Sequence, residues 1–272
     1  MWSLWIAGFV LVASGLEASS PGSREHFVRV MIDPGHGGED RGARGSGGLV
    51  EKDLVLDVSK RLARLLEKQG LEALLTRTDD QFVSLEKRSA VANEAGADLF
   101  VSIHANAAAT PAPRGVETFF LSLEASDEAS SRLAARENAS FRAARPLKRG
   151  KDPLDSLLRD MSSNESMRES DRFAKLADRE LSRLGPVPSR GVKQAPFRVL
   201  MGTQMPSVLV EIGFMSNPTE ESALRDARRR EAIATALARA VVAFGKQHNA
   251  RRGRTAALRP DEGRAALKGE RP

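Results

Sequence analysis

Short apolar segments rich in β-branched residues alternate with helical patterns, and this alternation most limits the fold of the chain. The apolar segments are VRVMI (28–32), LEALLTR (71–77), LFVSIH (99–104), VETFFLS (116–122), FRVLM (197–201) and SVLVEI (207–212). Between the early ones, helical periodicity covers 51–66 and 84–95, followed near the end by a final helix at 231–247. Strands alternating with helices predict an α/β fold, with a mainly parallel, twisted sheet of about six strands and helices on both faces.

Residues 124–190 do not follow this alternation of strands and helices. They are rich in Ser, Arg, Asp and Glu, and they predict helices without strands. We interpret them as a helical insertion between two strands of a single catalytic domain that covers 25–248.

The two ends of the chain differ from this domain. Residues 1–24 contain an apolar run, 4–16, that is too short for an ordinary membrane-spanning helix and fits a signal peptide; an uncleaved anchor or a wrongly chosen start codon are the alternatives. The formal net charge is +6, and the seven Lys/Arg and three Asp/Glu of 250–272 supply +4 of it. Residues 249–272 therefore read as a basic disordered tail. We expect an exported protein of the periplasm or cell envelope that binds no nucleic acid. Contact of the tail with an anionic wall polymer or a membrane surface is the functional alternative.

The chain has no cysteine, which excludes disulfides, thiolate metal ligands and a cysteine nucleophile. Any metal must then bind through carboxylates and the four histidines, His26, His36, His104 and His248. His26 and His248 lie near the ends of the predicted domain and are interpreted as bystanders.

His36 lies in a glycine-rich loop directly after the first predicted strand. The loop is not a phosphate-binding one, because GHGGED has Asp40 where a dinucleotide-binding loop needs its last glycine. It instead leaves one imidazole free of bulky neighbours, as an accessible metal site requires.

Three further residues are expected beside His36. His104 ends one predicted strand, Glu211 ends another, and Glu51 opens the helix that follows the first strand. In open α/β sheets ligands bind outside the carboxyl ends of the strands, so these positions converge at one edge.

Two imidazoles and one carboxylate are a common zinc set that leaves a fourth position open. Glu51, at a helix N-terminus, suits a ligand because the helix dipole favours its charged form. Glu211, between apolar neighbours, suits a general base that takes a proton from water and returns it to a leaving amine. Asp33, Glu39 and Asp40 share the first loop and compete with Glu51 for the ligand role.

Five segments in order, IDPGHGGEDRGARG, GLVEKDL, LLTRTDD, ADLFVSIHANA and SVLVEIGFMSNPTEE, resemble the zinc-dependent N-acetylmuramoyl-L-alanine amidases of bacterial cell separation. The resemblance covers about 28–248. It implies that His36, Glu51 and His104 bind one Zn²⁺, and that Glu211 is the catalytic carboxylate. The implied substrate is peptidoglycan, cut between N-acetylmuramic acid and L-alanine of the stem peptide.

The resemblance also suggests a role for the insertion. In cell-separation members a helical segment covers the zinc, sometimes with a glutamate as fourth ligand, until a divisome activator moves it. Here Glu124, Asp160 and Glu165 are the expected carboxylates, and a surface helical hairpin is the alternative. Asn106 and Arg77 also recur in the resembling motifs, with substrate contact and loop bracing both open. We expect a monomer.

Two other functions remain open. A zinc peptidase acting on stem peptides would use the same metal set. A catalytically silent module that binds peptidoglycan or regulates another protein would keep the fold, but it would not need all of His36, Glu51, His104 and Glu211.

Overall fold

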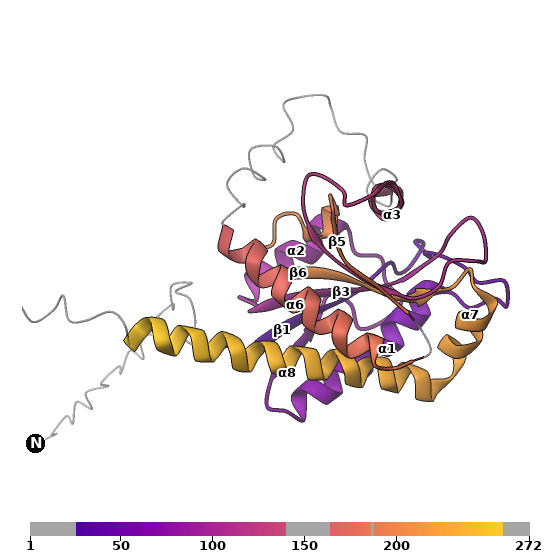
Figure 1. Ribbon diagram of the computed structural model, residues 1–272. Helices are drawn as coiled ribbons and strands as arrows, with labels where there is room; N and C mark the ends of the chain where they lie inside the picture. Colours follow the sequence, from indigo (N-terminus) through magenta and orange to yellow (C-terminus); the bar gives the residue numbers. More distant parts are fainter. Residues whose placement is uncertain (1–25, 140–163, 186–187, 258–272) are drawn as a thin grey trace, which may run out of the picture.

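The computed structural model describes residues 26–139, 164–185 and 188–257, and its centre is one six-stranded sheet (Figure 1). The strands are β1 (Arg29–Pro34), β2 (Glu72–Leu75), β3 (Leu99–Asn106), β4 (Val116–Leu121), β5 (Ser189–Ala195) and β6 (Ser207–Phe214). Their order across the sheet is β2-β1-β3-β6-β4-β5, and every pairing is parallel except that of β4 with β6. The predicted fold class is confirmed.

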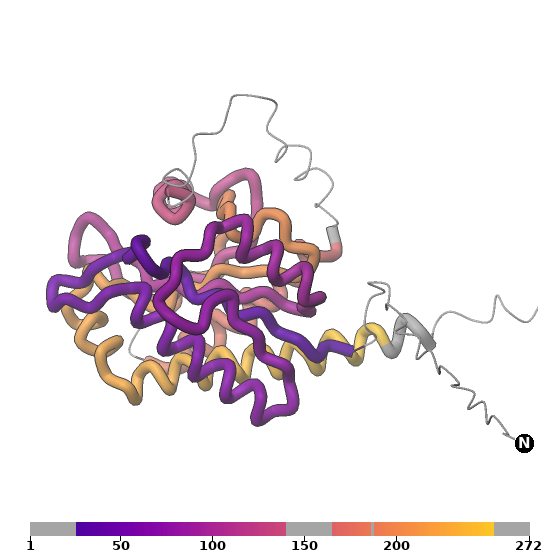
Figure 2. The backbone as a smooth tube through the Cα atoms, turned by 180° about the vertical axis from the view of Figure 1, so that it is seen from behind, coloured from indigo at the N-terminus to yellow at the C-terminus, as the bar shows by residue number. Residues whose placement is uncertain are grey.

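Helices cover both faces of the sheet. They are α1 (Glu51–Glu67), α2 (Leu85–Glu94), α3 (Glu128–Glu137), α6 (Asn164–Ser182), the 3₁₀ turn η1 (Arg198–Leu200), α7 (Pro218–Arg225) and α8 (Ala227–Ala257). Buried residues of α1, α6 and α8 form one core cluster with one face, and those of α2, α3 and η1 form a second cluster with the other. Figure 2 shows from behind how α8 runs along the body of the protein.

The sequence explains why β3 and β6 lie at the centre. All eight residues of each strand are buried, as expected for parallel strands covered on both faces. Leu54, Val58 and Leu62 line one side of α1 at helical spacing and are almost completely buried against the sheet.

The fifth predicted strand was wrong. Residues 197–201 form η1 and its flanks, and the strand at this place is β5, which ends at Ala195, before this segment. β5 is an edge strand with a half-exposed side, so it tolerates the polar sequence SRGVKQA. Pro196, which has no N–H to donate, follows the last residue of the strand.

Within 124–190 the structure has helices, as expected, but two features differ from a surface insertion without strands. α6 belongs to the helical layer on the sheet, because Phe173, Ala174, Ala177 and Leu181 are fully buried in the core. β5 begins within the same range. Residues 140–163 lie outside the described part of the chain.

The predicted disordered tail starts too early. α8 continues to Ala257, and Asn249 in this helix accepts a hydrogen bond of 2.7 Å from the backbone N–H of Phe27. The predicted leader, 1–24, and residues 258–272 lie outside the described ranges. Within those ranges no helix combines the length and the apolar character needed to cross a membrane.

Candidate metal centre and active site

Four side chains converge at the carboxyl ends of β1 and β3: His36, Glu51, His104 and Glu137. One potential ligand atom from each lies within 4.8 Å of all the others. His36 Nε2 is 3.1 Å from Glu51 Oε1 and 3.3 Å from Glu137 Oε2. His104 Nδ1 is 3.2 Å and 3.1 Å from the same two oxygens. The four atoms thus surround a common point.

These separations suit a tetrahedral zinc ion. Zn–N and Zn–O bonds of about 2.0–2.1 Å place tetrahedral ligand atoms about 3.3 Å apart. Moreover, the buried His36 Nε2 has no hydrogen-bond partner among the described residues, although it lies next to two carboxylates. A nitrogen placed in this way points at a shared centre and not at one neighbour.

Glycines make room for the two imidazoles. A Cβ added to Gly35 would lie 2.5 Å from the His104 ring, and one added to Gly42 would lie 2.6 Å from both Glu51 Oε2 and His36 Cδ2. His36 itself has a φ of 58°, which a non-glycine residue rarely adopts. The glycine-rich loop is therefore explained by close packing of backbone against the rings of His36 and His104.

Glu51 is held by two backbone amides at the start of α1. Oε2 accepts a hydrogen bond from Ala43 N–H at 2.8 Å, and Oε1 accepts one from Ala105 N–H at 3.0 Å. Burial raises the pKa of Glu51, but the charge of His36 and the hydrogen bond from His104 outweigh it and lower the pKa strongly. The carboxylate is thus fixed in position and ionised.

The neighbouring carboxylates raise the pKa of both histidines. Burial lowers the pKa of His104, but the charge of Glu137 and hydrogen bonds from Glu137 and Glu51 raise it to about 9. Burial also lowers the pKa of His36, but the charge of Glu51 and the hydrogen bond with Asp40 outweigh burial and raise this pKa well above its ordinary value. Asp40 Oδ2 lies 2.9 Å from His36 Nδ1 and so orients the ring with Nε2 toward the cluster.

Glu211 lies beside this cluster on β6, paired in register with His104 of β3. It is fully buried, and among the described residues neither of its carboxylate oxygens has a hydrogen-bond partner. Burial raises its pKa; the nearby His104 lowers it, and Glu137 and Glu51 raise it further, so that it lies well above the ordinary value. The four potential metal ligands therefore lie next to a buried carboxyl group that has a raised pKa and no hydrogen-bond partner among the described residues.

Comparisons with known proteins identify the family. Residues 30–243 match the N-acetylmuramoyl-L-alanine amidase family, Amidase_3. The chain belongs to this family. It is 37% identical over 217 residues to the amidase AmiA of Escherichia coli K12, covering 79% of this chain and 75% of AmiA. It is also 37% identical to AmiC of Escherichia coli O6:H1, covering 81% of this chain but only 54% of AmiC. This chain thus spans about half the length of that AmiC.

Solved amidase structures share the fold. The amidase AmiC2 of Nostoc punctiforme superposes with a TM-score of 0.60 at 30% identity, covering 82% of this chain and 98% of that one. The CwlD amidase of Clostridioides difficile, solved in complex with the GerS lipoprotein, superposes with a TM-score of 0.60 at 25% identity. It covers 80% of this chain and 98% of CwlD. The prediction of an enzyme of this class is confirmed.

Two arginines brace the loop of this amidase domain that carries His36. Arg77 donates to the carbonyls of Pro34, Gly35 and Lys52 at 3.0, 2.8 and 2.8 Å, and its side chain is buried. These are bracing contacts, the second of the two roles left open for Arg77. Arg88 donates to the His36 carbonyl at 2.8 Å. The sequence offered no signal for Arg88, which lies in an ordinary helical pattern.

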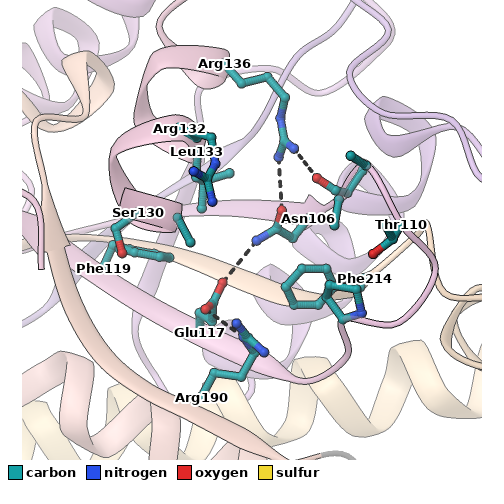
Figure 3. A pocket seen from close by; sticks show the side chains of 15 residues that line it. Asn106, Thr110, Glu117, Phe119, Ser130, Arg132, Leu133, Arg136, Arg190 and Phe214 are labelled. Carbon is teal, nitrogen blue, oxygen red and sulfur yellow. Dashed lines mark hydrogen bonds and ion pairs between the residues drawn. The ribbon is translucent and has the colours of Figure 1, made fainter. Parts of the chain in front are cut away.

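Asn106 borders a cavity of about 450 Å³ beside the cluster, between α3, β4 and the segment after β3 (Figure 3). Its amide nitrogen donates to Glu117 Oε2 at 3.0 Å, and its amide oxygen accepts from Arg136 at 3.2 Å. Asn106 therefore links β4 to α3 and also lines this cavity.

The carboxylate that joins the cluster from beyond β4 is Glu137, which the sequence analysis missed. Glu124 and Glu165, expected in this place, are exposed, and Asp160 lies outside the described residues. Glu137 is the last residue of α3 and shares its buried face with Ser130, Leu133 and Ala134. An acidic residue on the apolar face of an amphipathic helix was the signal that could have found it.

The remaining histidines do not join the site. His26 is exposed, and His248 lies against the rings of Phe27 and Phe244. Both belong to the end of the molecule where α8 contacts the start of β1.

Proposed function

We propose that this chain is a zinc-dependent amidase that hydrolyses the bond between N-acetylmuramic acid and L-alanine in peptidoglycan. The observation that carries the proposal is the convergence of His36, Glu51 and His104 next to the buried, unpartnered Glu211. AmiA and AmiC, which carry this activity in their names, are similar over most of the present chain.

The proposed roles follow from the positions. His36, Glu51 and His104 hold the zinc ion, which supplies Lewis-acid polarisation of a carbonyl and acidifies water. Glu211 takes the proton of the attacking water and delivers it to the departing amine of L-alanine. A raised pKa suits this double task, because a group that both accepts and donates a proton works best near the operating pH.

We further propose that α3 inhibits the enzyme. Structural zinc sites have four protein ligands, whereas catalytic sites keep one position for water or substrate. With Glu137 in place the set has four protein donors, so Glu137 must leave before substrate can enter. The charge of His104 and its hydrogen bond hold the pKa of Glu137 well below its usual range despite burial, so it stays an ionised donor.

The proposed setting is the cell envelope, in wall remodelling or separation of daughter cells, after export directed by residues 1–24. An activator protein that displaces α3 is the expected partner. The structure of CwlD in complex with the GerS lipoprotein is one case of an amidase with this fold bound by another protein, and it supports this proposal.

The test uses the full chain and its Glu137→Ala form, incubated with purified peptidoglycan with zinc or with a chelator. Zinc-dependent release of peptides that begin with L-alanine is the expected result. Peptides cut at other bonds would reassign the chain as a stem-peptide peptidase. Binding of peptidoglycan without cleavage by either form would favour a silent wall-binding module.

Metal content provides a second, independent measurement. The His104→Ala variant is expected to lose zinc, whereas His248→Ala, which removes a histidine outside the cluster, is expected to retain one ion per chain. Equal zinc content in both variants would contradict the proposed ligand set.

A further inference from the structure

α3 brings Glu137 to the other three potential metal ligands, yet few of its apolar side chains are buried against the rest of the protein. In this helix the buried apolar side chains are Leu133 and Ala134. The cavity of about 450 Å³ opens against the helix and is lined by Ser130 and Arg132, among others (Figure 3). A helix that borders a void of this size gains little from packing there. Polar contacts must therefore account for much of its attachment.

Arg136 fastens the end of the helix that bears Glu137. Its Nη2 donates to Asn106 Oδ1 at 3.2 Å, and its Nη1 donates to the carbonyl of Ala107. Its Nε donates to Glu137 Oε1 at 3.0 Å. One guanidinium thus ties the helix to the end of β3 and orients the carboxylate that reaches the cluster.

Asp127 and Lys193 fasten the beginning of the helix. Asp127 caps α3, because its Oδ1 accepts a hydrogen bond from Ser130 N–H at 2.7 Å. Its other oxygen lies 3.1 Å from Lys193 Nζ on β5. Hydrogen bonds from Ser130 lower the pKa of Asp127 to about 2, so this partner of Lys193 is ionised at neutral pH.

Glu117 on β4 contacts a residue from each of these two groups, Asn106 and Lys193. Its Oε1 accepts from Lys193 Nζ at 2.9 Å and from Arg190 Nε at 2.8 Å. Its Oε2 accepts from Asn106 Nδ2 at 3.0 Å, as Figure 3 shows. By accepting from the amide nitrogen of Asn106, Glu117 turns the amide oxygen toward Arg136. A single buried carboxylate is therefore connected to both ends of α3 across the cavity.

We propose that Glu117 is a positioning residue that holds both ends of α3 and so keeps Glu137 beside the other three potential metal ligands. We call this set of contacts, which runs through Asn106 to Arg136 and through Lys193 to Asp127, the clasp. This proposal rests on the proposed inhibition by α3 and names the group that controls it. Its partners are other than the four cluster residues, so its effect on the zinc site passes through Asn106, Arg136 and Lys193. Without the carboxylate charge, two charge-assisted hydrogen bonds from lysine and arginine become ordinary ones or are lost.

Other contacts keep α3 on the protein when this clasp is weakened. Ser126 exchanges hydrogen bonds with Gln194 on β5. Asn138, after the helix, donates to the Pro196 carbonyl at 2.9 Å and accepts from Arg198 N–H at 2.8 Å. These flanking contacts join the helix to the β5 side and can act as hinges, so a Glu117 variant is expected to loosen α3 without releasing it.

The experiment measures hydrogen exchange of α3 in the zinc-loaded full chain, together with amidase activity. In Glu117→Gln, a side chain of the same size, we expect α3 amides to exchange about 10-fold faster or more, because the loss of one charge-assisted hydrogen bond has this magnitude. Activity is expected to rise in the same variant with zinc content unchanged.

Glu180→Gln is the matched control. Glu180 is also buried and paired with a positively charged residue, its Oε2 lying 2.9 Å from Arg239 Nε, but it belongs to α6. We expect α3 exchange and activity to stay at the level of the unaltered chain in this control. Lys193→Met removes only the contact at the start of the helix and should also make the amides of α3 exchange faster. This variant replaces Glu117→Gln in the experiment if Glu117→Gln does not fold.

The outcomes separate the clasp from the inhibition. Unchanged α3 exchange in Glu117→Gln and in Lys193→Met, with higher activity in Glu137→Ala, would overturn the clasp and leave the inhibition standing. A second outcome would overturn the clasp in the same way. If Glu137→Ala is more active, but Glu117→Gln shows faster α3 exchange without higher activity, then Glu117 does not control the position of Glu137. If Glu137→Ala binds zinc but gains no activity, the inhibition itself is overturned.

Discussion

Glu211 lies opposite His104 in the register of the two central parallel strands, and among the described residues its carboxylate has no hydrogen-bond partner. A buried polar group without a partner costs free energy, so its presence at this position indicates a function other than stability. The partner expected during the reaction is water or the leaving amine.

Replacing Glu211 by Gln should separate catalysis from metal binding. In a Glu137→Ala background we expect the rate of peptidoglycan hydrolysis to fall about 10²- to 10⁴-fold, because the group that transfers the proton is gone. Zinc content should remain one per chain, and the melting temperature should not fall, since a neutral amide is easier to bury. A rate within twofold of the parent would refute the assignment.

Glu220→Gln provides the comparison for that variant. Glu220 is another buried glutamate, but it accepts hydrogen bonds from the backbone N–H groups of Phe214 and Gly115 at 2.6 and 2.9 Å. Its substitution should lower the melting temperature and leave the rate per folded molecule near that of the parent.

Glu137→Ala should activate the enzyme. Removing the fourth donor opens one position of the metal, and we expect activity to increase on the order of 10-fold or more, with zinc retained by the other three ligands. Glu124→Ala and Glu165→Ala, which remove exposed carboxylates of the same region, should leave activity unchanged. Activation by either of these, but not by Glu137→Ala, would place the inhibitory group elsewhere.

Gly35→Ala should weaken the metal site without unfolding the domain. The added Cβ would lie 2.5 Å from the His104 ring, so the ring has to move. We expect zinc affinity, measured by competition with a chelator, to fall about 10- to 100-fold, as for other changes that misorient a ligand. Gly185→Ala is the control, because no atom of the described residues lies within 4 Å of its Cβ position. Equal affinities in both variants would contradict this explanation of the glycine-rich loop.

Asp33→Asn should destabilise the fold in a pH-dependent way. Asp33 is fully buried and lies 2.8 Å from Arg88; burial raises its pKa, but Arg88 and hydrogen bonds from Thr76 and Ser102 lower it below the ordinary 3.8. Losing one partner of a buried pair costs about 3–5 kcal/mol. Because the folded-state pKa is depressed, this contribution is present above pH 3.8 and is lost as the pH falls through the folded-state value.

Urea unfolding at several pH values measures this effect. The difference in unfolding free energy between Asp33→Asn and the unaltered chain should be constant near neutral pH and should narrow below about pH 4. Asp171→Asn, which removes an i,i+4 pair with Lys175 on a helix surface, should change stability by less than about 0.5 kcal/mol. A difference that persists unchanged in acid would show that the Asp33 charge is not responsible.

Five of the six strands, the mainly parallel character of the sheet and the edge at which the candidate site lies follow from the sequence alone. Buried central strands read as continuous apolar runs, and histidine or glutamate at the end of such a run has to lie at the carboxyl edge of the sheet. This is why the sequence alone predicts that His36, Glu51, His104 and Glu211 lie together.

Which further residues meet there depends on contacts between elements that are distant in the chain. Glu137, Arg88 and Glu117 lie in ordinary helical or strand patterns, and their roles depend on neighbours brought from other parts of the chain. β5 was missed for a related reason, since an edge strand pairs on one side and need not be apolar. Periodicity records how much of each side chain is buried, whereas the choice of polar partners depends on distances between elements that no local pattern encodes.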